Sequence, residues 1–240
     1  MPTQATDAQA RRFGTRAILL TAGLALVAIP FLLLVLLVED RSPLLRDLDT
    51  GPRDALHSYA LDHRWFVSLM RLLSDSGTTT AWLVIFVPVV AWLLWRRSPR
   101  RALFVVSTVV LSSVLNNLVK VAVHRTRPVL ANPVASAGGA SFPSGHAQAA
   151  LVGYGVLVLI CGPLLRRPWR RLLFVVAAVM VLAIGLSRVA LGVHYVSDVL
   201  AGYVLGAAWL AAMTGAFRAW QHEAPRARRV ADHAGAALGP

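Results

Sequence analysis

Cysteine is almost absent from this 240-residue sequence. Cys161 is its one cysteine, so the chain cannot form an intramolecular disulfide, and the residue falls in an apolar run typical of a core or lipid-facing position. Charged residues are also scarce, at 15% of the chain, whereas soluble domains contain about a quarter. With a hydrophobic fraction of 57% and a mean hydropathy of +0.62, the composition indicates a protein that lies in a bilayer.

Lysine is equally rare: the sequence has one lysine, Lys120, and 23 arginines. This bias is typical of a GC-rich bacterial coding sequence. The net charge of +13 does not indicate a nucleic-acid partner. Most arginines lie in short clusters between apolar runs and do not line one polar face. The partners expected are therefore the bilayer and a membrane-resident substrate, and the oligomeric state stays open.

Long apolar stretches predict the fold. A transmembrane helix needs about 20 mostly apolar residues, and the stretches that meet this need are 17–38, 78–95, 102–123, 148–165, 172–189 and 196–217. Arginines precede the first stretch, as in a signal peptide, but its length and the acidic pair that follows it favour a retained helix. We predict an all-α bundle of six transmembrane helices over 17–220, between an N-terminal tail (1–16) and a disordered C-terminal tail (221–240).

The arginine clusters predict the orientation of this bundle. They lie before the first span, in the connections 96–101 and 166–171, and after the sixth span, which is one side of a six-span chain. The positive-inside rule makes that side the cytoplasm, so both termini are expected there, in a bacterial inner membrane. The segment 39–77 is then external, and it carries seven acidic residues against five arginines.

Apolar residues recur at helical spacing within this external segment, from 53 to 73. The pattern predicts one or two short amphipathic helices at the membrane surface. A simple connecting role and a substrate-gating role both stay open for them.

Three polar clusters lie on the external side, where the charge rule predicts few cations. They are Lys120 with Arg127-Pro128; Pro143-Ser144-Gly145-His146; and Ser187-Arg188 followed by His194 and Asp198. Charges at or within the ends of membrane helices are expensive to bury. The clusters therefore predict a functional site on this face.

The first use of these residues is to bind phosphate. Guanidinium groups match phosphate oxygens in pairs and lysine adds a point charge, so Lys120, Arg127 and Arg188 suit a phosphoryl group. Ser144 is a candidate helix N-cap, and Gly145 lets the backbone approach a ligand closely. The free N–H groups of that helix start would complete the phosphate site.

The second use is catalysis. His194 and Asp198 are four residues apart, so on a helix the carboxylate can hold one ring nitrogen and leave the other free to attack phosphorus. His146 then donates a proton to the leaving oxygen and later activates water. No metal or other cofactor is expected, since Asp198 is the only acidic residue of the clusters and no Cys or His pair has zinc spacing.

The three clusters resemble, in order and spacing, the motifs of the type 2 phosphatidic acid phosphatase (PAP2) family, or vanadium-haloperoxidase superfamily. Those motifs read K-x6-R-P, P-S-G-H and S-R-x5-H-x3-D, and this sequence matches every motif position. The resemblance implies a helical-bundle core open to the outer leaflet and a phosphohistidine mechanism. It assigns phosphate binding to five residues, Lys120, Arg127, Ser144, Gly145 and Arg188. It assigns the catalytic steps to His146, His194 and Asp198.

Several functions stay open within this reading. The lead hypothesis is a phosphatase for a lipid phosphate or diphosphate, with undecaprenyl diphosphate, phosphatidic acid and phosphatidylglycerol phosphate as candidates and the first two favoured. A haloperoxidase that binds vanadate in the same place is disfavoured by six spans without a long soluble helical domain. A catalytically inactive lipid-binding or transport protein would have no need of both histidines and the aspartate.

Neighbouring polar residues have simpler interpretations. Arg125 and His124 lie inside the first motif without being part of it and can face the lipid headgroups. His57 is expected to be solvated. Asn116 can position Lys120, or can simply hydrogen-bond a neighbouring helix. Gly202 and Gly206 form a small-xxx-small pair, which predicts close helix packing within the bundle.

Overall fold

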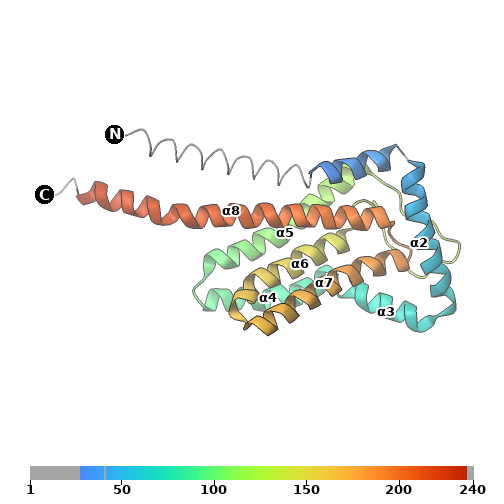
Figure 1. The fold of residues 1–240 in the computed structure, drawn as a ribbon, viewed down its shortest axis with the longest axis horizontal. Coiled ribbons are helices and arrows are strands. Elements are labelled where there is room, and N and C mark those ends of the chain that lie inside the picture. The colour runs from blue at the N-terminus through green and yellow to red at the C-terminus, as the bar shows by residue number, and fades with distance from the viewer. Residues whose placement is uncertain (1–27, 41, 237–240) are drawn as a thin grey trace.

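The computed structural model describes residues 28–40 and 42–236, and within them the fold is all-helical (Figure 1). The helices are Ala28–Glu39, α2 (Pro43–Asp62), α3 (Arg64–Asp75), α4 (Thr79–Trp95), α5 (Pro99–Val123), α6 (Gly145–Cys161), the short 3-10 helix η1 (Gly162–Leu164), α7 (Arg167–Ala190) and α8 (Val196–Ala236). Four stretches are long and apolar enough to cross a membrane: Pro99–Val123, Gly145–Leu164, Arg167–Ala190 and Val196–Trp220. A fifth candidate is α3 with α4, which meet at a bend of 45°.

The prediction of six spans is therefore met in part, by four to five candidates among the described residues. Half of the first predicted span, 17–38, lies outside the described residues, and its described part falls in the helix Ala28–Glu39, which is apolar but short. The second predicted span corresponds to α4, whose 17 residues reach the necessary length only together with α3.

Three of the other predicted spans coincide with a helix that is longer than its apolar run, whereas 148–165 corresponds to α6 together with η1. α5 begins at Pro99 and α7 at Arg167, because a proline in the first turn and the arginines beside it continue the helix past the hydrophobic stretch. α8 runs on to Ala236, so helical backbone extends into the segment predicted to be a disordered tail. Alanine and arginine, frequent in that stretch, are strong helix formers.

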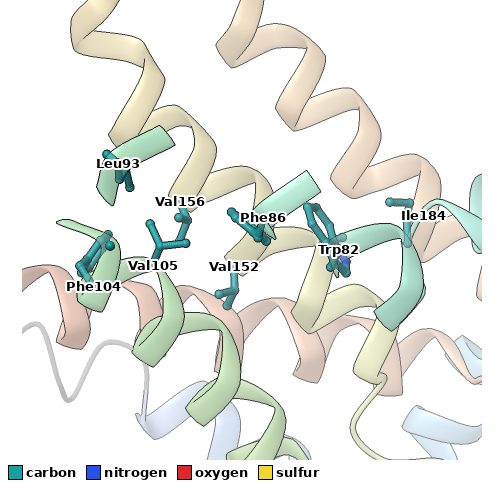
Figure 2. Packing of buried hydrophobic residues seen from close by; sticks show 10 residues of the cluster. Trp82, Phe86, Leu93, Phe104, Val105, Val152, Val156 and Ile184 are labelled. Carbon is teal, nitrogen blue, oxygen red and sulfur yellow. The ribbon is translucent and has the colours of Figure 1, made fainter. Parts of the chain in front are cut away.

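The core of the bundle lies around α6, which contacts α5, α7 and α8 (Figure 1). Figure 2 shows Trp82 and Phe86 of α4 beside Val152 of α6. The two aromatic rings stack with centroids 5.6 Å apart. A Cβ at Gly153 would come within 2.5 Å of the Trp82 ring, so the glycine lets that indole lie directly on α6.

Two glycines bring α8 equally close to α6. A Cβ at Gly202 would lie 2.6 Å from the Ser144 carbonyl oxygen, and one at Gly206 would lie 3.2 Å from the Gln148 carbonyl oxygen. The predicted close packing of this small-xxx-small pair is thus confirmed. As a consequence, the Ser144 N–H donates to the Asp198 carbonyl oxygen at 2.9 Å, which joins the start of α6 to the first turn of α8.

The segment before the second predicted span forms two helices, as the spacing of its apolar residues allows. They break at His63, whose backbone is extended. α2 crosses the end of the bundle where α7 ends and α8 begins, and it contacts both helices (Figure 1). A location at the membrane surface stays a prediction.

Candidate active site

The three polar clusters of the sequence come together at the end of the bundle that α2 crosses (Figure 1). Lys120 is in the last turn of α5, and Arg127 follows in the connection to α6. His146 is in the first turn of α6. Arg188 ends α7, and His194 lies in the turn before α8, where Gly192 adopts a positive φ of 71° that favours glycine.

His194 is held from both sides of its ring. Its Nδ1 lies 3.3 Å from Asp198 Oδ2, and its Nε2 lies 3.2 Å from Arg127 Nη1. A guanidinium group can only donate, so Nε2 accepts this hydrogen bond and the proton of the neutral ring is on Nδ1. Burial, and to a smaller degree nearby cations, lower the pKa of His194 to about 4 although Asp198 opposes the shift. The ring is therefore neutral at pH 7, with its Nε2 lone pair available.

Asp198 is fixed by more than the histidine. Its Oδ2 also accepts from the backbone N–H of Tyr195 at 2.9 Å and from the Ser141 hydroxyl. Its Oδ1 accepts from Arg125 Nη1 at 2.6 Å. The carboxylate is fully buried, so these donors supply the stabilisation that water would otherwise give to its charge.

Arg125 is a member of the site, which corrects the expectation that it faces the headgroups. Besides Asp198, its guanidinium contacts Asp49 Oδ2 at 2.7 Å and the Ser197 hydroxyl at 2.6 Å. It also lies over the Tyr195 ring, 4.2 Å from the centroid. Burial works against the charge of Arg125, but the two carboxylates outweigh it and raise the pKa.

Backbone carbonyl groups of the connection between α5 and α6 hold two of the predicted phosphate ligands. Lys120 Nζ donates to the Ala140 carbonyl at 3.0 Å. Arg127 donates to the carbonyl groups of Gly138 (3.0 Å) and Val193 (2.8 Å). Burial is the main cause that lowers the pKa of Arg127. Among the described residues neither cation forms an ion pair with a carboxylate, and Arg127 lies directly beside His194.

Arg188 completes the cationic group from the opposite side. Its Nη1 donates to the Ser74 hydroxyl at the end of α3, and among the described residues its buried Nε has no acceptor. A guanidinium that is buried with an unused donor is ready to bind an anion.

The start of α6 supplies further donors. Ser144 caps the helix, its hydroxyl accepting from the Ala147 N–H at 3.5 Å. The N–H groups of Gly145 and His146 find no acceptor among the described residues, as expected for a first helical turn. The His146 ring lies within the field of the Arg188, Lys120 and Arg127 charges and is also close to His194. Both histidines therefore face the same cationic region.

The sequence did not identify every residue of this site. Asp49, Ser197 and Ser141 hold Arg125 and Asp198, and Ser74 holds Arg188. Gly77, in the turn before α4, lies against His146, because a Cβ there would be 3.2 Å from the ring. Ser197 occupies a variable position of the third motif and the others stand outside the motifs, so the motif spacing gave no signal for them.

Two of the simpler interpretations can also be compared with the structure. His57 was expected to be solvated, but it lies on the buried side of α2, near Gly192. Asn116 donates to the Gln148 side chain at 2.7 Å, which is the interhelical hydrogen bond that the sequence left open. Within the described residues no group of three or more His, Cys, Asp or Glu side chains could hold a metal ion.

A cavity of about 630 Å³ lies next to the site, between the helix Ala28–Glu39, the start of α2 and the end of α5. Asp49, Arg125 and Tyr195 form part of its wall. Neither His146 nor His194 lines it, and Asp198 stands between Arg125 and His194. The cavity is therefore on the Nδ1 side of His194 and is distinct from the cationic region at Nε2.

Comparison with solved structures supports the architecture. The crystal structure of a transmembrane PAP2-type phosphatidylglycerolphosphate phosphatase from Bacillus subtilis superposes with a TM-score of 0.71 at 25% identity, covering 80% of this chain and 94% of that one. The structure of Aquifex aeolicus LpxE shares the fold, with a TM-score of 0.55 at 19% identity over 70% of this chain and 95% of that one.

Sequence relatives agree. Phosphatidylglycerophosphatase B of Bacillus subtilis is 30% identical over 145 residues, which is 59% of this chain and 70% of the relative. An undecaprenyl-diphosphatase of Sulfolobus acidocaldarius is 33% identical over 148 residues, 59% of this chain and 66% of the relative. The model of the PAP2 superfamily matches residues 101–221, which contain all three motifs. This chain, with its helical bundle and its two histidines among buried cations, belongs to the PAP2 superfamily.

Proposed function

We propose that this protein removes phosphate from a lipid phosphate or diphosphate, with His194 as nucleophile and His146 as general acid. Relatives in the family are lipid phosphatases, and the apolar helices indicate a membrane protein, so a membrane lipid phosphatase is the supported class. The observation that carries the mechanism is the Nε2 lone pair of His194, which is oriented through Asp198 and lies close to the cations Arg127 and Arg188.

In the first step, His194 Nε2 attacks phosphorus while the bond from phosphorus to the lipid oxygen breaks. Protonated His146 gives its proton to that oxygen, so the lipid leaves as an alcohol, or as a monophosphate when the substrate is a diphosphate. Asp198 stabilises the positive charge that develops on the His194 ring. The products are the free lipid and phosphohistidine.

In the second step, neutral His146 takes a proton from water, whose oxygen attacks the phosphorus. The bond between phosphorus and Nε2 breaks, its electrons return to Nε2, and inorganic phosphate leaves. His146 is again protonated, so the cycle closes with one water consumed. In both steps the cations stabilise charge on the equatorial phosphoryl oxygens.

Arg127 has to change its partner during this cycle. In the free enzyme its Nη1 donates to the same Nε2 that attacks phosphorus. Phosphate oxygens are stronger acceptors than a neutral imidazole, so a bound phosphoryl group would draw this donor from Nε2 to oxygen. Substrate binding would then free the lone pair at the moment when it is needed.

The lipid is the open part of the proposal. Phosphatidylglycerol phosphate and undecaprenyl diphosphate are suggested by the names of the relatives, and phosphatidic acid by the resemblance of the motifs. All three present a terminal phosphate at the headgroup level. We propose that the site faces the external leaflet, as the charge rule predicts.

The test is phosphate release by the purified protein in detergent with EDTA present, measured on these three lipids. The wild type should hydrolyse at least one of them, and His194→Ala should reduce the rate by at least about 1,000-fold while leaving the protein folded. His63→Ala is the matched control, because the His63 ring contacts the Tyr59 carbonyl at 2.9 Å and lies at the break between α2 and α3, away from the three motifs. Activity that survives in His194→Ala, or that strictly needs a divalent metal, would contradict the mechanism.

A further inference from the structure

We infer that Asp49 of α2 is a positioning residue of the active site, which acts on His194 through Arg125 and Asp198. The inference rests on the proposed phosphatase function. It also gives a role to the segment between the first two predicted spans, whose purpose the sequence left open.

The contacts form one continuous chain of hydrogen bonds. Asp49 Oδ2 accepts from Arg125 Nη2 at 2.7 Å, and Arg125 Nη1 donates to Asp198 Oδ1 at 2.6 Å. The other oxygen of Asp198 is the one beside His194 Nδ1. Asp49 is therefore separated from the catalytic ring by two side chains, and each link is charge-assisted or involves a charged group.

Ser197 closes this chain into a ring. Its N–H donates to Asp49 Oδ1 at 2.8 Å and its hydroxyl donates to Asp49 Oδ2 at 2.7 Å. The same hydroxyl accepts from Arg125 Nη1. Both oxygens of Asp49 are thus engaged, and Asp49 fixes the first turn of α8 as well as the guanidinium. That turn carries Asp198, so the carboxylate is held through its backbone and through its side chain.

Because the group formed by Asp49, Arg125 and Asp198 is buried, removing one of its charges should disturb the position of the others. Asp49 is 1% exposed and Asp198 is fully buried. Two carboxylates and one guanidinium leave the group with one net negative charge, next to three cations of the proposed phosphate site. Without Asp49, Arg125 would keep one carboxylate and one hydroxyl and could turn toward the cavity that it lines. Asp198 would then hold the His194 ring less firmly.

A purely mechanical role for Asp49 would be simpler, since α2 has to be attached to the bundle. α2 does have apolar attachments, because Leu56 packs against the cores around Ala190 and around Val189. The buried carboxylate of Asp49 is thus not needed to attach α2 to the bundle. Burying an ion pair stabilises a fold weakly or not at all, and such groups are better explained by the geometry that they impose.

The experiment is single-turnover hydrolysis with enzyme in excess, using the most rapidly hydrolysed lipid of the panel in mixed detergent micelles. Under these conditions the rate constant reports the chemical step and does not depend on the fraction of inactive molecules. Asp49→Asn should lower it at least 10-fold, with KM in steady-state assays changed less than threefold. Asp54→Asn, on the same helix but exposed and paired with Arg53, should stay within twofold of wild type.

The energetic coupling between Asp49 and Arg125, measured with single and double variants, gives a second readout. Arg125→Gln leaves two buried carboxylates without their cation, so it should be the slowest variant. In Asp49→Asn/Arg125→Gln the net charge of the group is restored, and the rate constant should not fall below that of Arg125→Gln, whereas independent residues would multiply their losses. If Asp49→Asn does not fold, Ser197→Ala keeps all charges and should still lower the rate constant at least threefold.

A wild-type rate constant in Asp49→Asn, or in Ser197→Ala where the first does not fold, would overturn the inference and leave the proposed function intact. Multiplicative losses in the double variant would overturn it as well. A wild type that hydrolyses none of the lipids would overturn the proposed function first, and this inference with it.

Discussion

Arg127 donates to the ring nitrogen of His194 that we propose as the nucleophile, at 3.2 Å. The same guanidinium group is held by carbonyl groups of Gly138 and Val193, so its plane and its direction are fixed before substrate arrives. A lysine could bring the charge but could not bond Nε2 and these carbonyl groups at once.

Arg127→Lys should therefore lower kcat/KM by about 100-fold, in keeping with the loss of one charge-assisted interaction in the transition state. Initial rates of phosphate release measure the effect. Arg71→Lys is the matched control, because Arg71 also donates to a carbonyl group of the same connection, that of Val134 at 2.7 Å, but is exposed. Equal losses in the two variants would show that the arginines act only by holding the loop.

The lowered pKa of His194 predicts how stability depends on pH. Burial keeps the folded ring neutral down to about pH 4, whereas the unfolded ring takes up a proton near pH 6.5. Below pH 6.5 the unfolded state binds more protons, so the stability that depends on a neutral His194 is present above this pH and is lost as the pH falls towards 4. The loss is at most about 1.4 kcal/mol per pH unit.

Thermal unfolding in detergent at pH 7 and pH 5 measures this dependence. The apparent Tm of the wild type should fall more between the two values than that of His194→Gln, which has no ring to protonate. Parallel decreases would mean that other groups set the acid sensitivity of the fold.

Gly202 links helix packing to the site. A methyl group there would meet the Ser144 carbonyl oxygen at 2.6 Å and push the start of α6 away from α8, where the Ser144 N–H reaches the Asp198 carbonyl. Gly202→Ala should cost about 1–3 kcal/mol of stability and reduce activity at least 10-fold. Gly215→Ala on the same helix has nothing within 4 Å of the new Cβ and should lower neither property. For each variant the apparent Tm measures the stability and the initial rate of phosphate release measures the activity.

The sequence predicted the eight motif residues because their spacing is local. His194 and Asp198 share one turn, and Lys120 and Arg127 lie on either side of a helix end. Apolar runs predicted the positions of α5, α6, α7 and α8, although hydropathy cannot detect the polar turns that extend these helices at their ends.

The contribution of α2 could not be predicted in this way. Asp49 lies 76 residues from Arg125 and 148 from Ser197, so only the folded chain brings them together. Burial follows the apolar pattern of the segment only in part, since Ala60 is buried as the pattern predicts, whereas Tyr59 is exposed and the polar His57 is buried. Asp49 can be buried on α2 because Arg125, which follows α5, and Ser197, in the first turn of α8, supply its hydrogen-bond donors.

The orientation of the site in the membrane is a separate prediction, and the single native cysteine makes it testable. In a Cys161→Ser background, Ser136→Cys places an exposed thiol in the connection between α5 and α6, on the side of the site. Arg166→Cys places one at the exposed start of α7, among the arginines of the opposite end. A membrane-impermeant maleimide added to intact spheroplasts should label Ser136→Cys at once and Arg166→Cys only after lysis. The reverse pattern would put the arginine clusters outside and the histidines towards the cytoplasm. Such a result would leave the proposed chemistry intact but would move the substrate to the inner leaflet.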